Sequence, residues 1–354
     1  MTDRSRTPST TTKLINALAF LSTLYGLVAS LFLLLRKPVS EDNKLVSLFN
    51  AFAHMLMLPA LVLVPLSVLL KRPWVALFHL MPAVTFVRDY GRFFQPRPVV
   101  LPANTTRQLK VLTYNIHGEA DILDPMVSIL RGCGADVVSL QELSQEAADC
   151  FKSAVSDLYP HMALYPSPQA SRGQGVLSRF PITSAEYWRN PQIAKHTLGH
   201  LRVELDVSGT TVTLYNAHPI HPGMGNHGFS TRPRGAEIDV VLGKAARDSG
   251  PILIMGDFNM TDQSEDYQRI TGRFTDSFGT VGSGMGFTFP DLSDFQSLPT
   301  YWPLPVRLFR FLRLDYIFHN GYFHPLHAYV WPTAGGSDHR PVFALLALKD
   351  TPTT

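Results

Sequence analysis

The sequence predicts an α/β domain that follows an N-terminal membrane anchor. Two long uncharged apolar runs stand near the start of the 354-residue chain, at residues 14–35 and 45–70. From Gln108 onward, short β-like runs alternate with amphipathic helical patterns, and this alternation is typical of the α/β class. The chain is also long enough for two separate parts. A third observation, polar side chains gathered where predicted strands end, indicates which chemistry to look for.

The two apolar runs are each long enough to cross a bilayer. They contain 22 and 26 residues, and about 20 apolar residues in a helix span the hydrocarbon core. A secretory signal peptide is the competing interpretation of the first run. We exclude it because this apolar core is too long for a signal peptide and a second span follows directly. Residues 1–13, which precede the first run, are predicted to be a disordered tail.

A third apolar segment, residues 74–90, completes the predicted anchor. Its uncharged part is short for a span, so it crosses only by tilting or by letting Arg88 and Arg92 reach back to the interface. We therefore predict an anchor of two to three transmembrane helices within residues 14–98. Residues 99–107 are predicted to be a linker, because prolines and small polar residues crowd this stretch.

Basic residues around the spans predict the orientation of a multi-pass membrane protein. The tail and the second short loop carry five, against three in the first loop: Arg4, Arg6, Lys13, Lys71 and Arg72 against Arg36, Lys37 and Lys44. The positive-inside rule then places the N-terminus in the cytoplasm. With three spans the C-terminal domain is extracytoplasmic, and with two spans that side is reversed.

The charge of the C-terminal part argues against a nucleic acid partner. Residues 1–104 carry 11 basic and 4 acidic side chains, whereas residues 105–354 carry 20 and 24. Proteins that bind duplex nucleic acid usually present a basic footprint. The expected partners are the lipid bilayer and a membrane lipid or lipid-linked phosphate, and the sequence indicates no protein partner.

The predicted domain covers residues 108–349, which is ample for a large core. Expected helices lie at 124–132, 145–158 and 234–249; Asp124 caps the first of them, and Pro125 stands at its first position. The expected strands are β-branched or alternating apolar runs bounded by turn residues: 109–116, 135–142, 175–182, 201–207, 211–219, 251–259, 313–320 and 341–348.

Six predicted strand termini carry an acid, an amide or an imidazole. A single such residue is most simply a turn former. Six in one domain indicate a site, because ligands of α/β folds bind at the strand ends. The residues are Asn115 with His117, Gln141 with Glu142, Asn216 with His218, Asp257 with Asn259, Asp315, and Ser337 with Asp338 and His339.

These residue types point to metal-dependent phosphate chemistry. Carboxylate and carboxamide oxygens without cysteine suit a hard cation, Mg²⁺ or alternatively Mn²⁺. Such an ion stabilises a leaving oxyanion, and histidines supply proton transfer and positive charge. Neither a phosphate-binding glycine loop nor a nucleophilic-serine elbow occurs in the sequence. We therefore expect attack of water on a phosphate ester or anhydride.

Six motifs in order resemble the endonuclease/exonuclease/phosphatase superfamily. They are TYNIHG (113–118), QE (141–142), NAHP (216–219), GDFN (256–259), LDYIF (314–318) and SDHRPV (337–342). Each motif alone is weak, but the ordered set covers nearly the whole domain. The resemblance implies a four-layer α/β sandwich of two packed sheets with helices outside.

The resemblance also implies the roles of the site residues. Glu142 matches the principal metal ligand, with Asn115 beside it, and Asp338 matches a second carboxylate on the metal side. Asn115 also counts as a substrate-binding candidate. The implied catalytic residues are Asp257 for the attacking water, Asn259 as a donor to phosphoryl oxygens, His339 oriented by Asp315, and His218 as a phosphate contact.

The predicted anchor narrows the expected substrate. Three-helix anchors before this domain resemble a bacterial membrane-anchored branch of the superfamily, which includes phosphatases acting on a polyprenyl diphosphate. The resulting hypothesis is a membrane-anchored Mg²⁺-dependent phosphohydrolase of lipid-linked phosphates or diphosphates. The alternatives are a phosphodiesterase of the same fold (sphingomyelinase-like or a nuclease) and a non-catalytic membrane receptor or scaffold.

Several residues outside the motifs have two interpretations. Arg172 is a candidate phosphate contact by its position in the sequence. Residues 301–314, rich in aromatics and arginines, form either a membrane-facing lip, with Arg307, Arg310 or Arg313 at headgroups, or an ordinary loop and strand. His221 and His227 either extend the site or belong to a glycine-rich loop, and His196 either lies near the phosphate or forms a surface pair with His200. His117 has no assigned role.

Overall fold

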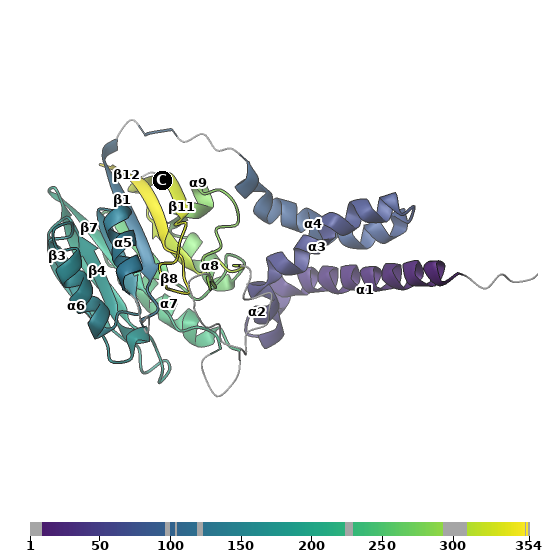
Figure 1. Ribbon diagram of the computed structural model, residues 1–354, viewed down its shortest axis with the longest axis horizontal. Helices are drawn as coiled ribbons and strands as arrows, with labels where there is room; N and C mark the ends of the chain where they lie inside the picture. Colours follow the sequence, from purple (N-terminus) through teal and green to yellow (C-terminus); the bar gives the residue numbers. More distant parts are fainter. Residues whose placement is uncertain are drawn as a thin grey trace, which may run out of the picture. The chain divides into compact units, whose positions relative to one another are not determined.

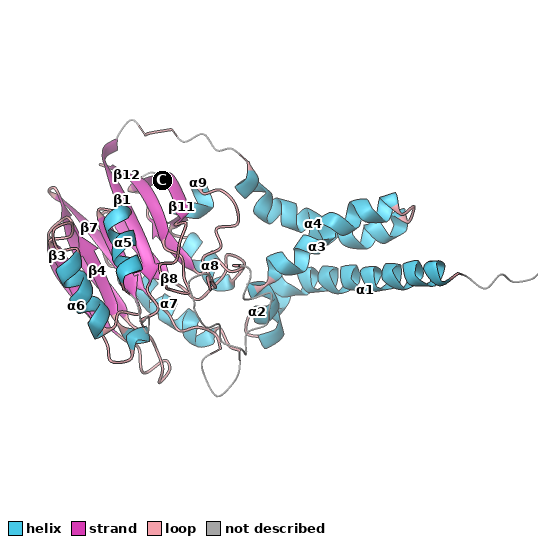
Figure 2. Cartoon of the chain, viewed as in Figure 1, coloured by secondary structure: helices cyan, strands magenta, loops and turns pink. Residues whose placement is uncertain are grey.

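A computed structural model describes residues 9–95, 100–102, 105–118, 123–223, 229–292, 310–350 and 352. The chain divides into two compact units, Met1–Phe94 and Gln95–Thr354. The first unit is helical, and the second combines helices with strands (Figures 1 and 2).

The first unit consists of helices α1 (Thr10–Val39), α2 (Lys44–Ala51), α3 (Ala53–Leu69) and α4 (Pro73–Tyr90), followed by the short 3-10 helix η1 (Gly91–Phe94). Residues 10–13 of the predicted tail are helical, because the Ser9 side chain caps α1 by accepting the N–H of Thr12 at 3.2 Å. Residues 1–8 lie outside the described residues. The predicted span 45–70 is broken at Phe52, where α2 and α3 meet at 60°.

One described helix, α1, is long and apolar enough to cross a membrane by itself. The bent pair α2–α3 passes the same test if it counts as one span, and α4 does not pass it. Burial in this unit is inverted relative to a water-soluble domain. Among the described residues of the whole chain, the exposed large apolar side chains all lie between Leu14 and Leu101. The interior holds apolar side chains such as Ala29 and Met57 together with polar pairs such as Ser22 Oγ with His79 Nε2 at 2.8 Å.

The second unit is built on two six-stranded sheets. The first has the order β11-β12-β1-β2-β4-β3, and the second β5-β6-β7-β8-β10-β9. Only the pairs β1–β2 and β7–β8 are parallel among the described pairings. The strands are β1 (Thr105–Asn115), β2 (Val137–Gln141), β3 (His161–Tyr165), β4 (Gln174–Ser178), β5 (Ile182–Trp188), β6 (His200–Val207), β7 (Thr210–Ala217), β8 (Ile252–Asp257), β9 (Thr275–Asp276), β10 (Asp315–His319), β11 (Phe323–Val330) and β12 (Val342–Lys349).

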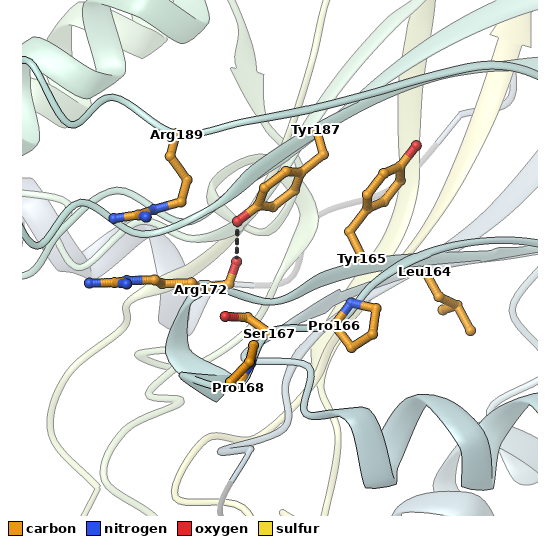
Figure 3. A pocket seen from close by; sticks show the side chains of 8 residues that line it. All are labelled: Leu164, Tyr165, Pro166, Ser167, Pro168, Arg172, Tyr187 and Arg189. Carbon is orange, nitrogen blue, oxygen red and sulfur yellow. Dashed lines mark hydrogen bonds between the residues drawn. The ribbon is translucent and has the colours of Figure 1, made fainter.

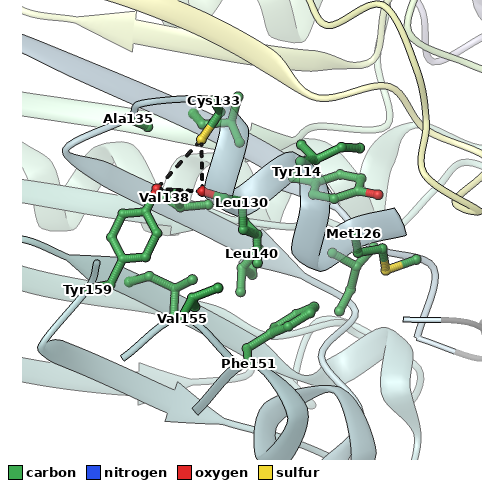
Figure 4. Packing of buried hydrophobic residues seen from close by; sticks show 14 of the residues in the cluster. Tyr114, Met126, Leu130, Cys133, Ala135, Val138, Leu140, Phe151, Val155 and Tyr159 are labelled. Carbon is green, nitrogen blue, oxygen red and sulfur yellow. Dashed lines mark hydrogen bonds between the residues drawn. The ribbon is translucent and has the colours of Figure 1, made fainter. Parts of the chain in front are cut away.

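Helices cover the outer face of each sheet. Helices α5 (Asp124–Gly132) and α6 (Gln145–Ala154) pack on the first sheet through a buried apolar cluster (Figure 4). Helices α7 (Arg232–Ala245) and α8 (Glu265–Thr271) pack in the same way on the second sheet, and α9 (Ser277–Val281) follows β9. The predicted four-layer α/β sandwich is therefore confirmed.

The sequence missed the four strands that lie at the edges of the sheets, β3, β5, β9 and β11. Edge strands bury less of their surface, so their apolar alternation is weak. Strand β5 is mostly exposed, and β11 contains Pro325 at a register shift. The predicted strand 175–182 is two elements, because β4 ends at Ser178 and β5 begins at Ile182.

Strand alternation places the polar strand ends between the two sheets. Leu112, Tyr114, Val138 and Leu140 face the outer helices in one apolar cluster. Their neighbours Thr113, Asn115, Ser139 and Gln141 therefore face the second sheet, because successive side chains point to opposite faces. Across the gap, Gln141 Nε2 donates to Asn216 Oδ1 at 2.8 Å, so a buried hydrogen bond joins β2 to β7.

We predict that buried His319 makes folding stability sensitive to acid. Its ring is 2% exposed, Nδ1 lies 3.0 Å from the Asn320 carbonyl oxygen, and Nε2 has no partner. Burial lowers the pKa of His319 to about 4. The folded state thus binds fewer protons than the unfolded state, whose histidine titrates near 6.5, and the stabilisation present above that pH is lost as the pH falls.

The expected loss attributable to His319 is about 2 kcal/mol between pH 7 and pH 5. Chemical denaturation at both pH values would measure it in the wild type and in His319→Phe, which keeps an aromatic ring without the titration. Between pH 7 and pH 5, the free energy of unfolding should fall by about 2 kcal/mol less in the variant than in the wild type. An identical pH dependence in both proteins would contradict the assignment.

Candidate active site

The pairing of the strands brings the polar termini to one edge of the sandwich. In the first sheet, Asn115 at the end of β1 lies opposite Gln141 at the end of β2. In the second sheet, β10 runs antiparallel to β8, so its first residue, Asp315, lies opposite the last residue of β8, Asp257. The motifs are far apart in the chain, but the two sheets place them at a common edge.

Asn115 connects the two halves of this site. Its Nδ2 donates to Asp257 Oδ2 at 3.0 Å and to Glu142 Oε1 at 3.2 Å, and its Oδ1 accepts the N–H of His117 at 3.0 Å. Asn115 and Asp257 are buried, whereas the Glu142 side chain is 22% exposed. Burial, reinforced by the nearby carboxylate of Asp338, raises the pKa of Glu142. Glu142 is thus a partly exposed carboxylate whose protonated form is favoured by burial and by Asp338.

His339 and Asp315 form a buried ion pair. Nδ1 of His339 lies 2.9 Å from Asp315 Oδ2, and Nε2 lies 3.6 Å from Asp257 Oδ2. Burial by itself lowers the pKa of His339, but the carboxylates of Asp315 and Asp257 outweigh burial and raise it well above the usual value. At neutral pH the His339 ring is therefore an imidazolium.

His218 is the second imidazole beside Asp257, and its ring is neutral. Its Nε2 is 3.5 Å from Asp257 Oδ2 and 3.8 Å from Glu142 Oε1, and the residue is 1% exposed. Burial lowers the pKa of His218 to about 4, despite the pull of Asp257. Burial also raises the pKa of Asp257 itself, against the attraction of protonated His339. The site thus holds one carboxylate between a charged and a neutral imidazole.

The remaining motif residues lie around this centre. Asn259 donates its side-chain N–H to the Pro219 carbonyl at 3.1 Å, and its backbone N–H to Asp257 Oδ1 at 2.9 Å. Asp338 Oδ1 lies 3.4 Å from His117 Nδ1. His117, Glu142 and Asn259 have positive φ angles of 47°, 61° and 50°, a conformation that non-glycine residues rarely adopt. Such strain is often found at functional sites, where the surrounding structure maintains it.

Gly256 lets the second sheet close on this edge. Its φ is 149°, and a Cβ built there would lie 1.9 Å from the Ala217 carbonyl oxygen of the neighbouring strand. No side chain fits at that distance. The glycine of PILIMGDFN is therefore required by the approach of β7 to β8, and Asp257 follows it directly.

Two further side chains support the site, and one of them, Glu237, escaped the sequence analysis. Ser337 Oγ donates to the Asn115 carbonyl at 2.7 Å and accepts the His339 N–H at 3.0 Å, which ties the last loop to β1. Glu237 of α7 lies 3.1 Å from His200 Nε2 and accepts the Ile220 N–H at 2.8 Å. A signal for Glu237 exists: it occupies the buried stripe of α7, at helical spacing from Arg234 and Val241.

The interpretation of His200 as a surface residue was wrong. His200 is completely buried, stacks on Trp188, and accepts the N–H of His218 at Nδ1, 3.4 Å away. A buried strand end explains this burial, because β6 begins at His200. His196 is exposed, and Nδ1 of His221 accepts the N–H of Gly223 at 3.1 Å. His227 lies outside the described residues.

Arg172 and the described end of the 301–314 segment, residues 310–314, have neighbours of their own. Arg172 is in the short 3-10 helix η2 (Ala170–Arg172) and lines a neighbouring hollow. A headgroup contact for Arg313 is wrong, because its side chain is 4% exposed and pairs with Asp276 at 2.6 Å. Arg310 pairs with Asp291 at 3.2 Å. Residues 301–309, including Arg307, lie outside the described residues.

Comparison with known proteins agrees with this geometry. A profile of the Endonuclease/Exonuclease/phosphatase family matches residues 112–339, which contain five of the six motifs and the Ser337, Asp338 and His339 of the sixth. The chain belongs to this family. Its members are metal-dependent hydrolases of phosphate esters, and the buried carboxylates and imidazoles at the strand ends are the residues that such chemistry uses. A search of curated proteins by sequence found no match.

Solved structures share the fold at low sequence identity. An endonuclease/exonuclease/phosphatase from Beutenbergia cavernae is 21% identical, with a TM-score of 0.52 over 70% of this chain and 73% of that one. One from Bacteroides vulgatus is 18% identical, with a TM-score of 0.55 over 69% and 100%. D. rerio TDP2, complexed with single strand DNA product, is 19% identical, with a TM-score of 0.54 over 68% and 98%.

The family members depend on a divalent metal, and the donor set of this site fits one. Asp257, Asp315 and His339 place one ligand atom each within 4.8 Å of one another, and of these the carboxylates would bind the cation, because a protonated His339 offers no lone pair. Glu142, whose side chain is 22% exposed, adds a further carboxylate that shares the donor Asn115 with Asp257. Asn115 points its amide nitrogen, rather than its oxygen, at Glu142 and Asp257, so its side chain has to rotate before it can bind a cation.

The side chains also indicate how the reaction is assisted. A bound divalent cation would polarise the phosphoryl group and stabilise the leaving oxygen. Asp257, held by Asn115 and Asn259, is placed to orient or deprotonate the attacking water. An imidazolium at His339 would supply positive charge without having to reorient during the reaction, because Asp315 already fixes the ring.

We predict that Asp315→Asn lowers kcat by roughly 10²- to 10⁴-fold, with little change in KM. Asparagine keeps the shape but removes the charge that keeps His339 protonated. Hydrolysis of p-nitrophenyl phosphate and bis(p-nitrophenyl) phosphate would measure the effect. Asp157→Asn is a matched control, because Asp157 is exposed in the turn after α6 and pairs with Arg131 of α5. Equal activity in the two variants would refute the role of Asp315.

Proposed function

We propose that the protein is a membrane-anchored, Mg²⁺-dependent phosphohydrolase of lipid-linked phosphates or diphosphates. The observation that carries the proposal is the combination, in one chain, of a phosphate-ester hydrolase site with a helical unit whose outer surface is apolar. A soluble substrate would give no reason for such an anchor. A phosphate carried on a lipid is confined to the membrane in which the anchor holds the enzyme.

The packing of α4 supports a third membrane crossing. Contacts along α4 follow α1 in the same direction: Arg72 Nη2 bonds Asn16 Oδ1 at 2.6 Å, His79 bonds Ser22 at 2.8 Å, and Asp89 pairs with Arg36 at 3.5 Å. Residues 16–36 of α1 cover about 30 Å, the thickness of a bilayer core. If α1 crosses, α4 lies at the same depth beside it.

Close packing explains why α4 is less apolar than α1. A Cβ on Gly26 would lie 2.6 Å from the Phe78 carbonyl oxygen, so the two helices approach closely at a small residue. One face of α4 is thereby shielded from lipid and tolerates polar residues. Three crossings and the excess of basic residues in the N-terminal tail together favour a cytoplasmic N-terminus and an extracytoplasmic catalytic domain.

Charge and donor chemistry support the remaining parts of the proposal. The oxygen donors favour Mg²⁺, with Mn²⁺ as the alternative, over softer metals. Residues 105–354 carry 20 basic and 24 acidic side chains, which disfavours a polyanionic nucleic acid as substrate. The alternative function is a phosphodiesterase of the same fold, sphingomyelinase-like or a nuclease.

The function would be tested by product release from the detergent-solubilised full chain. A polyprenyl diphosphate, sphingomyelin and a single-stranded DNA oligonucleotide would be incubated in parallel, with Mg²⁺ or with EDTA. We expect Mg²⁺-dependent orthophosphate release from the polyprenyl diphosphate alone. Glu142→Ala should abolish it, whereas Glu146→Ala, an exposed glutamate on α6, should retain it. Cleavage of DNA or sphingomyelin instead would replace the substrate and keep the site.

The topology would be tested by cysteine labelling in a Cys150→Ser background, which leaves Cys133 buried. A membrane-impermeant maleimide should label Glu146→Cys in intact cells, because three crossings place the catalytic domain outside. It should label Thr10→Cys only after lysis. Labelling of both positions from the same side would contradict three crossings.

A further inference from the structure

A hollow of about 490 Å³ lies beside the active site, and its lining differs from that of the site (Figure 3). Strand β3 supplies Tyr165, strand β5 supplies Tyr187, and η2 supplies Arg172. Arg189 follows β5, and Ser167 lies on the opposite wall. Carboxylates dominate the active site, whereas this hollow is lined by arginine, tyrosine, serine, proline and leucine.

The walls of the hollow are continuous with the active site. Leu143, the residue after Glu142, donates its N–H to the Gly173 carbonyl at 3.1 Å and accepts the Ser167 N–H at 3.1 Å. On the other wall, a Cβ on Gly199 would lie 2.1 Å from the Arg172 carbonyl oxygen. Gly199 directly precedes His200, which supports the backbone of His218. One wall thus contacts the residue next to Glu142, and the other contacts the residue next to His200.

The two arginines of the hollow lack an acidic partner. Both are half-buried, and neither forms an ion pair with any residue that the structure describes. Buried and half-buried arginines elsewhere in this unit do have one, for example Arg202 with Asp248, Arg234 with Asp266 and Arg313 with Asp276. Figure 3 shows the guanidinium groups of Arg172 and Arg189 extending toward the same side of the hollow. Two guanidinium groups that extend to one side of a hollow, without an ion pair to any described residue, are suited to bind an anion.

The arginines are held in place by neighbouring groups. The Tyr187 hydroxyl donates to the Arg172 carbonyl at 2.9 Å, and Arg189 Nε donates to the Thr197 carbonyl at 3.0 Å. The Tyr187 ring stacks on Tyr165 with centroids 5.4 Å apart and planes 9° from parallel. Burial raises the pKa of Tyr187 although both guanidinium groups act to lower it, so the hydroxyl remains a neutral donor. Because these side chains and the backbone beside them are already held in place, a ligand would lose little affinity to ordering them.

Guanidinium groups bind phosphate oxygens in a planar, two-point geometry, and two of them suit a doubly charged phosphoryl group. We propose that the hollow binds a second phosphoryl group of the substrate, with Arg172 and Arg189 as its ligands, while the scissile phosphoryl group lies at Glu142, Asp257 and His339. The preferred substrate is then a diphosphate rather than a monophosphate. This inference rests on the proposed function, since it assumes hydrolysis at the neighbouring site.

The test compares two substrates that share one lipid chain, geranylgeranyl diphosphate and geranylgeranyl monophosphate. Arg172→Gln and Arg189→Gln should each lower kcat/KM for the diphosphate by roughly 10- to 100-fold, mainly through KM. Activity on the monophosphate should change by less than about threefold, because these arginines do not contact its only phosphoryl group. Arg189→Lys should recover part of the loss, since it keeps the charge. Arg247→Gln, an exposed arginine after α7, is the matched control.

Equal losses on the two substrates, or no loss on either, would overturn the second phosphoryl site. Thermal unfolding of each variant separates these outcomes from a folding defect. Arg189→Gln also removes the hydrogen bond to the Thr197 carbonyl, so Arg189→Lys separates the effect of the charge from the effect of that bond.

Failure of the proposed function would be distinguishable. If the wild type hydrolyses neither lipid, titration calorimetry with inorganic pyrophosphate in metal-free buffer still tests the hollow. Binding that is lost in the Arg172→Gln/Arg189→Gln double variant but kept in Glu142→Ala supports the inference. Absence of binding to the wild type overturns it.

Discussion

The architecture of the second unit depends on a few buried polar bonds that cross between its two sheets. Gln141 reaches Asn216 at 2.8 Å, and Asn115 reaches Asp257 at 3.0 Å. Apolar side chains alone would let two sheets slide, because dispersion contacts have no direction. A buried hydrogen bond is costly to break, so each of these bonds fixes the offset between the sheets. The same offset places a carboxylate of one sheet against the amide of the other.

The active site separates two chemically identical imidazoles by their surroundings. His339 has an acidic partner on each ring nitrogen, in Asp315 and Asp257, and stays charged. His218 is just as deeply buried, but Asp257 and Glu142 lie 3.5 and 3.8 Å from a single ring nitrogen, and burial outweighs them and keeps the ring neutral. Pairs of titratable groups pushed in opposite directions are typical of acid–base chemistry. The supports behind them, Ser337 for His339 and Glu237 through His200 for His218, contact no solvent and serve to hold position.

The sequence predicted the central strands and the residues at their ends, because those strands are rich in apolar residues and stop abruptly at polar ones. It could not predict the edge strands, whose alternation is weak, as the mostly exposed β5 illustrates. It marked Arg172 as a candidate phosphate contact by its position in the sequence. It did not mark Arg189, because only the fold brings β5 beside η2. It also misjudged His200, because a histidine at a strand start gives no sign of a buried glutamate on a helix far along the chain.

The division of the active site between two sheets also determines what inactivation reports. Each sheet is held to its own helices by a separate apolar cluster, so loosening of the layer between them need not melt either half. A state of that kind would keep its circular dichroism while losing the contact of Asn115 with Asp257. Loss of turnover would then precede loss of secondary structure on heating. Turnover in this protein therefore reports the packing of the two sheets against each other. Circular dichroism, which follows total secondary structure on unfolding, does not report that packing separately.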